Sequence, residues 1–181
     1  DARPAVKAFF MDRGEPIVDA VVSLTGFSLV GGPAYNDTDA AQEMLEALDV
    51  PYLAAQGLEF QSLQDWESSS MGLMPVEATM MVAIPELDGA TGSMVFGGRS
   101  ELSAGEKFDM QPAPERIDRL ADRVARLVGL RHTPIAERKV AIVLFNFPPN
   151  SGAAGTAAHL SVFESLFNTL SAMREEGYHV D

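Results

Sequence analysis

The first part of the chain alternates short apolar runs with polar, glycine-rich connections. Residues 18–24 (VDAVVSL) form a β-branched apolar run that predicts a buried strand, and residues 25–33 follow it as a glycine-rich loop. Candidate N-caps at 36–38 precede a segment ending at residue 48 in which apolar residues recur at helical spacing. Residues 50–54 (VPYLA) predict the next strand. This order of strand, loop, helix and strand implies a parallel sheet.

A methionine-rich apolar segment, 75–84, occupies the middle of the chain after a short helix predicted over 63–67. Its composition favours a helix, with a strand left as the alternative. Pro75 suits the first helical turn, and Pro85 is expected to end the helix because proline lacks the backbone N–H that a helix interior uses.

The next segments are a short strand, a loop and a long helix. Residues 93–96 predict the strand, the glycines at 97–98 are expected to stop it, and 101–113 read as an irregular exposed loop. Residues 114–130 give the clearest helical pattern of the chain. Four arginines and two aspartates lie on its polar face, which favours a solvated surface over a basic binding site.

The last part of the chain repeats the organisation of the first. A polar linker precedes residues 139–145 (KVAIVLF), the strongest strand signal, and a second glycine-rich loop over 146–155 leads into a helix predicted over 156–176. We therefore expect an α/β fold with a parallel sheet, built from flavodoxin- or Rossmann-like units with flanking helices. One domain is expected over 1–137 and the start of a second, incomplete lobe over 138–181.

Charge and composition exclude several classes of protein. Among 181 residues the net charge is −13, and residues 1–98 hold 15 acids and 3 bases, a net of −12. That sign disfavours binding to nucleic acid, while a solvated acidic surface or attraction of a basic partner both remain open. No apolar stretch has the length of a membrane span. The absence of cysteine excludes disulfides, thiolate-held zinc and iron–sulfur clusters within the chain.

Two glycine-rich loops are the first candidate ligand sites. A loop between a parallel strand and a helix N-terminus presents free N–H groups to anions. The first loop contains Gly31 and Gly32, and the second contains Asn150, Gly152 and Gly155 and leads into Thr156. Neither matches a nucleotide motif, because one lacks the Walker A lysine and the other lacks the GxGxxG spacing. Tight-turn glycines without a ligand are the equally weighted alternative.

Carboxylates and a lone arginine are the second set of candidates. Glu86 and Asp88 follow the apolar segment and precede a turn glycine, where they suit a proton acceptor or a weak Mg²⁺ site. Taken alone, they are explained better by a polar turn that ends a helix. Arg99 is an isolated cation that can clamp a carboxylate or pair locally. The three histidines have no metal-site spacing, and His159 is best placed, one turn into the helix after the second loop.

Five segments, in this order and spacing, resemble the large porphyrin-binding subunit of magnesium chelatase, with the large subunit of cobaltochelatase as a more distant relative. They are VDAVVSLTGFSLVGGP (18–33), LDVPY (48–52), MVAIPELDG (81–89), VFGGR (95–99) and FNFPPNSGAAGTAA (145–158). The resemblance spans nearly the whole chain and implies a piece of a much longer polypeptide.

The resemblance implies insertion of Mg²⁺ into protoporphyrin IX, with ATP hydrolysed by two partner subunits of AAA+ type and not bound here. Metallation removes two pyrrole protons and strips water from the ion. We expect Glu86 and Asp88 to act as proton acceptor and Mg²⁺ ligands. Porphyrin anchors are expected at Gly31, Gly32, Arg99, Asn150, Gly152, Gly155 and Thr156. The implied setting is the bacterial cytoplasm, at the periphery of a photosynthetic membrane.

Two departures from the chlorophyll-type pattern limit the carry-over of catalytic roles. Glu77 and His159 stand where members of plants and cyanobacteria often have Gln and Tyr. These residues point toward bacteriochlorophyll synthesis and weaken a catalytic claim for either side chain. Two other functions stay open: a cobaltochelatase fragment, and a docking domain that contacts the ATPase partners without touching porphyrin.

Overall fold

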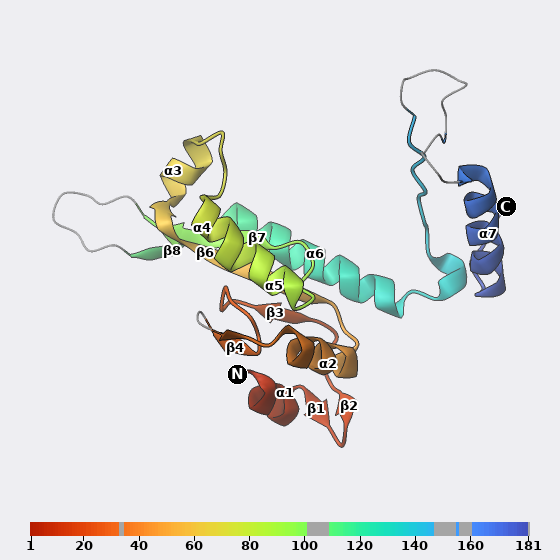
Figure 1. Cartoon of the computed structure of the whole chain (residues 1–181), viewed down its shortest axis with the longest axis horizontal. Coiled ribbons are helices and arrows are strands. Elements are labelled where there is room, and N and C mark those ends of the chain that lie inside the picture. The colour runs from red at the N-terminus through yellow and green to blue at the C-terminus, as the bar shows by residue number, and fades with distance from the viewer. Residues whose placement is uncertain (33–34, 101–108, 147–154, 156–160, 181) are drawn as a thin grey trace. The chain divides into compact units, whose positions relative to one another are not determined.

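The computed structural model describes residues 1–32, 35–100, 109–146, 155 and 161–180 (Figure 1). The chain forms two compact units, Asp1–Val128 and Gly129–Asp181. In the described part of the chain, no helix combines the length and the apolar character that crossing a membrane requires. The predicted second lobe, 138–181, lies inside the second unit, and its completion as a separate domain stays a prediction.

The first unit contains most of the regular structure. Its elements are α1 (Arg3–Phe9), β1 (Met11–Asp12), β2 (Glu15–Pro16), β3 (Val21–Ser23), β4 (Gly31–Gly32), β5 (Tyr35–Asn36), α2 (Thr38–Leu48), β6 (Tyr52–Ser62), α3 (Leu63–Ser68), α4 (Pro75–Glu77), the π-helix η1 (Ala78–Ala83), α5 (Ile84–Leu87), β7 (Met94–Arg99) and β8 (Met110–Pro112). Helix α6 (Pro114–His132) crosses the boundary, and the second unit adds the 3-10 helix η2 (Ile135–Glu137) and α7 (Val162–Glu175).

A four-stranded sheet in the order β3-β6-β7-β8 organises the first unit. β3 pairs with β6 and β6 with β7 in parallel, while β8 joins antiparallel to β7. The parallel β3–α2–β6 unit predicted from residues 18–54 is therefore confirmed, and so is the mixed α/β class with a mostly parallel sheet and flanking helices. Asp37 caps α2 as expected, with its carboxylate accepting a hydrogen bond from Ala40 N.

Strand β6 is much longer than the five-residue strand expected at 50–54. Its first residues pair with β3, and residues 55–62 pair with β7 on the other side, with register shifts after Gln56 and after Leu58. The extension depends on a partner strand that lies some forty residues further along the chain, so local pattern could not indicate it. The bulges bend β6, so that its two halves serve two different neighbours.

Gly97 and Gly98 lie inside β7, so the prediction that they stop the strand is wrong. A Cβ on Gly97 would lie 2.5 Å from the carbonyl oxygen of Gln111 in β8, and one on Gly98 would lie 2.7 Å from the Cβ of Leu58 in β6. The two glycines therefore allow neighbouring strands to approach closely, which is a recognised use of glycine within a sheet.

Residues 75–87 are helical throughout, and Pro85 does not end the helix as predicted. The chain widens into the π-helix η1 and then re-tightens, which places Pro85 in the first turn of α5. A proline ring removes one N–H and crowds the carbonyl four residues earlier, which belongs to Met81. The buried side chain of Gln56 donates its amide to that carbonyl, so β6 supplies the hydrogen bond that Pro85 cannot.

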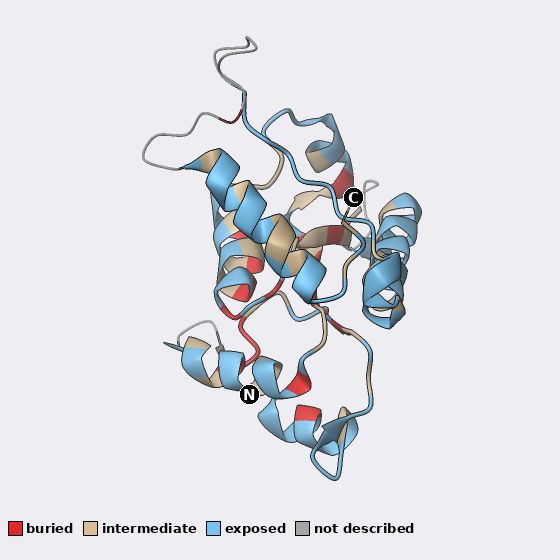
Figure 2. Cartoon of the chain, turned by 90° about the vertical axis from the view of Figure 1, so that its right-hand side faces the viewer, coloured by how far each residue is buried: buried red, intermediate tan, exposed pale blue. Residues whose placement is uncertain are grey.

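Two apolar clusters hold the first unit together, and Figure 2 shows buried positions concentrated in its inner segments. One gathers around Val30, Leu48 and Tyr52 between the helices α1 and α2 and the start of β6. The other gathers around Leu58 and Val95, with Trp66 and Leu73 packed against it. Each large side chain that is fully buried, such as Leu48 or Leu58, contributes about 1.5–3 kcal/mol to the stability of the folded chain.

Arginines of α6 attach this helix to the sheet. The guanidinium of Arg116 donates to the carbonyl of Val95 at 3.4 Å and lies 5.5 Å from the centre of the Trp66 ring. Arg123 donates to the carbonyl of Gly92 at 3.0 Å. The polar face, for which the sequence favours a solvated surface over a basic binding site, therefore also carries two of the contacts that position α6. Figure 1 draws this helix behind the strands.

The strand predicted over 139–145 is not formed among the described residues. This segment pairs with none of their strands, and its apolar side chains are exposed, with Val143 at 91% and Phe145 at 66%. A buried strand needs neighbours for both its backbone groups and its side chains. The prediction is wrong for this structure because no described strand pairs with this segment.

The different surroundings of two glycines predict opposite effects of glycine-to-alanine substitution on stability. Gly98→Ala should lower the free energy of unfolding by about 1–3 kcal/mol, because the added methyl overlaps Leu58. Gly129→Ala, in α6 with no atom of the described residues within 4 Å of the new Cβ, should raise it by roughly 0.5–1 kcal/mol. Urea unfolding of both variants measures the pair, and equal effects would contradict the close contact.

Candidate functional site

The best-defined polar site lies where the first glycine-rich loop meets the end of α5. Asp88 follows α5 and is fully buried. Its Oδ2 accepts a hydrogen bond of 2.8 Å from the backbone N–H of Leu29, 59 residues earlier. Its Oδ1 is also buried and has no hydrogen-bond partner among the described residues. One carboxylate oxygen therefore holds the loop, and the other can accept a hydrogen bond from a further group.

Tyr52 adds a second buried polar group to this region. Burial raises the pKa of its hydroxyl from 10.0 to about 12, the nearby Ser23 side chain offsets part of the rise, and the Asp88 carboxylate adds to it. The Tyr52 carbonyl accepts hydrogen bonds from the N–H and hydroxyl of Thr91 at 2.9 and 3.3 Å. The ends of β3 and α5 and the start of β6 thus share one polar cluster.

Within the described part of the first glycine-rich loop, the Ser28 side chain and the Gly31 backbone fix the local conformation. Ser28 Oγ donates to the Val30 carbonyl at 2.9 Å and accepts from the Val30 N–H at 3.2 Å. Gly31 has a φ of +128°, and a Cβ there would lie 2.1 Å from the carbonyl oxygen of Tyr35. Gly31 and Gly32 form β4, paired antiparallel with β5. The positive φ and the close contact explain why glycine is needed at Gly31, whereas the role of Gly31 and Gly32 as porphyrin anchors stays a proposal.

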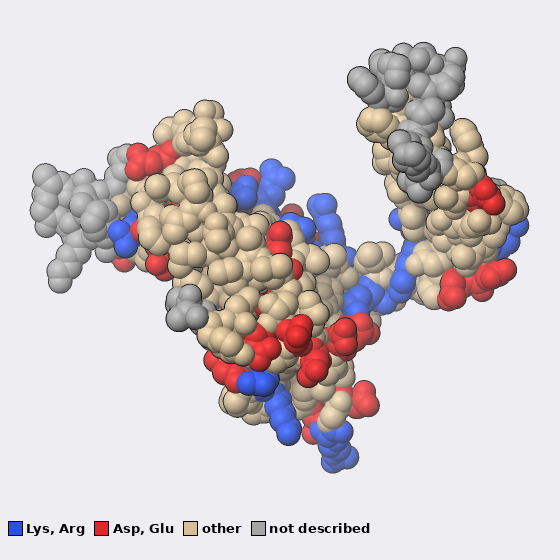
Figure 3. Space-filling model, viewed as in Figure 1, with Lys and Arg blue, Asp and Glu red and all other residues tan. Residues whose placement is uncertain are grey.

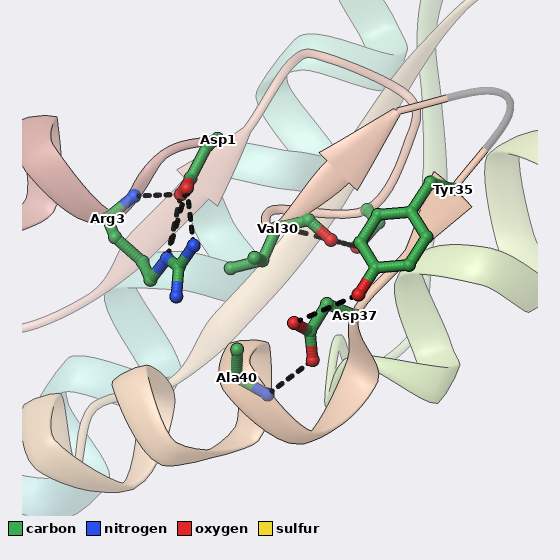
Figure 4. A network of polar contacts seen from close by, with 7 residues as sticks. Asp1, Arg3, Val30, Tyr35, Asp37 and Ala40 are labelled. Carbon is green, nitrogen blue, oxygen red and sulfur yellow. Dashed lines mark hydrogen bonds and ion pairs between the residues drawn. The ribbon is translucent and has the colours of Figure 1, made fainter.

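The exit of the loop is fixed at the N-terminus of α2 (Figure 4). The Asp37 N–H donates to the Val30 carbonyl at 3.0 Å. The Asp37 carboxylate accepts from Ala40 N at 3.1 Å and from the Tyr35 hydroxyl at 3.4 Å. Both ends of the loop are thereby attached to the body of the first unit.

Glu86 and Asp88 lie in different environments although only one residue separates them. Glu86 is exposed on α5, whereas Asp88 is fully buried against the loop. Among the residues that the structure describes, no three His, Cys, Asp or Glu side chains gather into a group able to hold a metal ion. The spacing alone could not tell which of the two carboxylates faces inward.

A second buried carboxylate, Glu77, lies at the start of the same helical segment. Its Oε2 accepts hydrogen bonds from the side chain of Gln61 and from Met74 N, the latter at 3.0 Å. Its Oε1 is buried without a partner among the described residues. Glu77 therefore ties β6 to α4. A glutamate three residues after the N-cap, here Met74, is the sequence signal for its bond to Met74 N, whereas nothing local indicates the contact with Gln61.

Arg99 is not brought to the first glycine-rich loop. It ends β7 and is paired with Ser62 of β6, whereas Ser23, just before the loop, is paired with Ala54. Eight residues of strand separate those two positions on β6, which corresponds to roughly 26 Å along the strand. The proposed anchoring role of Arg99 thus belongs to the far end of the sheet.

The structure describes the second glycine-rich loop only at its two ends, residues 146 and 155. Gly155 is buried with a φ of +70°, and its N–H donates to the Phe145 carbonyl at 2.8 Å. A Cβ there would lie 3.3 Å from side-chain atoms of both Val162 and Phe163. Asn150, Gly152, Thr156 and His159 lie outside the described residues, so their predicted roles stay predictions.

The buried hydroxyl of Tyr52 predicts a specific loss of stability in alkali. The pKa of the hydroxyl is about 12 in the folded chain and 10.0 in the unfolded chain. The stabilisation by the neutral hydroxyl is therefore complete below pH 10 and is lost as the pH rises to 12. The loss should amount to roughly 2–3 kcal/mol. Urea unfolding of wild type and Tyr52→Phe at pH 8, 10 and 11.5 measures it. Tyr35→Phe, at an exposed position, should keep the wild-type alkaline slope, and a Tyr52→Phe slope equal to wild type would contradict the prediction.

Comparison with known proteins gives the family of the chain. A family model described as CobN/Magnesium Chelatase matches residues 1–181. The chain is 55% identical to the magnesium-chelatase H subunit of Cereibacter sphaeroides over its full length, and 43% identical over 93% of its length to the chloroplastic ChlH subunit of magnesium chelatase from Oryza sativa subsp. indica. It spans 16% and 12% of those proteins.

A solved structure supports the same relationship at the level of the fold. The catalytic subunit of cobaltochelatase from Mycobacterium tuberculosis matches 90% of this chain with a TM-score of 0.75 and 30% sequence identity, over 14% of its own length. The resemblance stated from the motifs is confirmed by both comparisons. The chain therefore belongs to the CobN/magnesium chelatase family.

Proposed function

We propose that this chain is part of the porphyrin-binding subunit of a magnesium chelatase, which holds protoporphyrin IX while Mg²⁺ replaces two pyrrole protons. The observation that carries the proposal is the 55% identity with a magnesium-chelatase H subunit across the whole chain. In this proposal Mg²⁺ and protoporphyrin IX are substrates, and ATP is hydrolysed by two AAA+ partner subunits. The implied location is the bacterial cytoplasm beside a photosynthetic membrane.

The reaction needs a base that solvent-borne Mg²⁺ and the pyrrole N–H groups can both reach. Glu86 fits that requirement because it is exposed next to the buried cluster. We assign it the role of proton acceptor and transient Mg²⁺ ligand, since a weakly held hard cation needs only one or two carboxylate oxygens from the protein. A carboxylate that accepts a proton in the rate-limiting step contributes about 10²–10⁴-fold to a rate.

Asp88 has two roles in this proposal. Its Oδ2 holds Leu29 and thereby fixes the loop that borders the site. Its Oδ1 offers a second acceptor for a proton or for Mg²⁺, and its lack of a partner among the described residues supports that role. Glu86 and Asp88 thus both remain the proposed proton acceptors and Mg²⁺ ligands. The exposed carboxylate of Glu86 makes the first contact with the ion.

The porphyrin anchors divide into separate regions of the chain. Gly31 and Gly32 border the Asp88 cluster, and Arg99 lies at the opposite end of β6. Gly155 belongs to the second unit, as do the remaining anchors proposed for the second loop, Asn150, Gly152 and Thr156. We propose that each of these positions can contact a porphyrin propionate, and because roughly 26 Å of strand separates Arg99 from the first loop, one porphyrin does not contact both at once.

Two alternatives each rest on a particular observation. The structural match to a cobaltochelatase catalytic subunit keeps Co²⁺ and a corrin-pathway substrate as the second candidate. Figure 3 shows acidic side chains gathered in clusters on the first unit, which supports a docking surface for the ATPase partners as the third candidate. Mg²⁺ ranks first because the identity with a magnesium-chelatase subunit is 55%, against 30% with the cobaltochelatase subunit.

Glu86→Gln in the full-length subunit tests the catalytic assignment. The substitution keeps the size of an exposed side chain, so folding should be retained while Mg²⁺ insertion falls by about a hundredfold, as expected for loss of a general base. Insertion is measured by porphyrin fluorescence with Mg²⁺, ATP and both ATPase subunits present.

Glu46→Gln is the matched control, because Glu46 is an exposed glutamate on α2. It should insert Mg²⁺ at the wild-type rate. Unchanged insertion by the Glu86→Gln protein would remove Glu86 as base or ligand, and the family assignment would survive that result.

A further inference from the structure

A pocket of about 520 Å³ opens between α1, the β1–β2 turn and α2. Such a volume lies in the range of small-molecule sites, roughly 300–1,000 Å³. Val6 and Leu48 are buried in its floor, and the flexible side chains of Met11 and Met44 complete an apolar surface that can adapt to a ligand. The lining residues are Arg3, Val6, Lys7, Met11, Arg13, Gly14, Met44, Ala47 and Leu48.

All three basic residues of positions 1–98 line this pocket. Arg3, Lys7 and Arg13 are the only Lys or Arg in a stretch that contains 15 acids. Figure 3 shows basic side chains at the end of the first unit where Figure 1 places α1 and the β1–β2 hairpin, with acidic groups around them. Their convergence on one pocket places three positive charges where an anionic group can reach them.

Among the described residues, two of these three cations form no ion pair. Arg3 is held by Asp1 in a forked ion pair with a shortest distance of 2.6 Å, drawn in Figure 4. Neither Lys7 nor Arg13 takes part in an ion pair within the described part of the chain. Both therefore keep their charge available for a ligand at the pocket.

The position of Arg13 is set by an uncommon backbone conformation. Arg13 and Gly14 form the two-residue turn between Asp12 and Glu15, with φ values of +52° and +90°. Such turns favour Asn-Gly or Asp-Gly because both positions need a positive φ. An arginine in the first position brings a guanidinium to the pocket.

We propose that this pocket binds an amphipathic anion, an apolar molecule that carries a carboxylate or phosphate group. The apolar body packs against Val6, Met11, Met44 and Leu48, and the anionic group is held by Lys7 and Arg13. None of the lining residues belongs to α5 or the first glycine-rich loop, so this site is separate from the proposed chelation site. An acyl carboxylate and a ring-bearing carboxylate share this chemistry.

Photolabelling of the full-length subunit tests the proposal. A long-chain fatty acid bearing a diazirine is the probe, and labelled residues are mapped by mass spectrometry. We expect label on Met11 and Met44. Reversing both charges, with Lys7→Glu and Arg13→Glu, should weaken labelling by about tenfold or more, the effect of losing charge-assisted contacts. Ala47→Trp, which fills the pocket from an exposed position, should weaken it similarly.

Arg126→Glu provides the matched control, because Arg126 is an exposed arginine of α6 that does not line the pocket. It should leave labelling unchanged. Competition by unlabelled oleate identifies an acyl ligand, and competition by a porphyrin dicarboxylate identifies a ring-bearing one. Absence of label at Met11 and Met44, labelling that survives the charge reversal, or equal competition by inorganic phosphate would each overturn the proposal.

Discussion

A hydrogen bond from the Leu29 N–H to the buried carboxylate of Asp88 is the interaction on which the site depends. It joins the loop after β3 to the end of α5, two segments that are 59 residues apart. Burying a carboxylate is costly unless its oxygens are satisfied, and among the described residues one oxygen has a partner and the other has none. Glu77 shares this imbalance, whereas both oxygens of Asp37 accept hydrogen bonds. The contact with the first glycine-rich loop is what sets Asp88 apart from both.

Strand β6 determines where each part of the site lies. Its start pairs with β3 and its far half pairs with β7, so the Asp88 cluster forms at one end and Arg99 at the other. The side chain of Gln56, near the middle of the strand, supplies the hydrogen bond that Pro85 removes from the Met81 carbonyl. A helix containing a proline can therefore continue across the sheet and deliver Asp88 to the loop. π-helical turns such as η1 often accompany functional sites.

The sequence was sufficient wherever the determinants were local. The spacing of apolar residues and the Asp37 cap defined the β3–α2–β6 unit, and the helical pattern defined α6. The sequence was insufficient where a distant segment determines the structure of an element. The length of β6 and the place of Gly97 and Gly98 follow from partner strands, and residues 139–145 lack such partners among the described residues. The sequence identified the two carboxylates of the site. It could not show that Glu86 faces solvent and Asp88 faces the loop. Tyr52 and Gln56 were missed because their roles arise only after folding.

Amide hydrogen exchange at Leu29 tests the central role of Asp88 most directly. The Leu29 amide should be protected in the wild-type chain and in Asp88→Asn, which keeps one carbonyl oxygen as an acceptor. In Asp88→Ala its exchange should accelerate about tenfold or more, the effect of losing one buried hydrogen bond, while the amide of the buried Leu53 in β6 stays protected. Equal Leu29 exchange in all three proteins would contradict the anchoring role of Asp88.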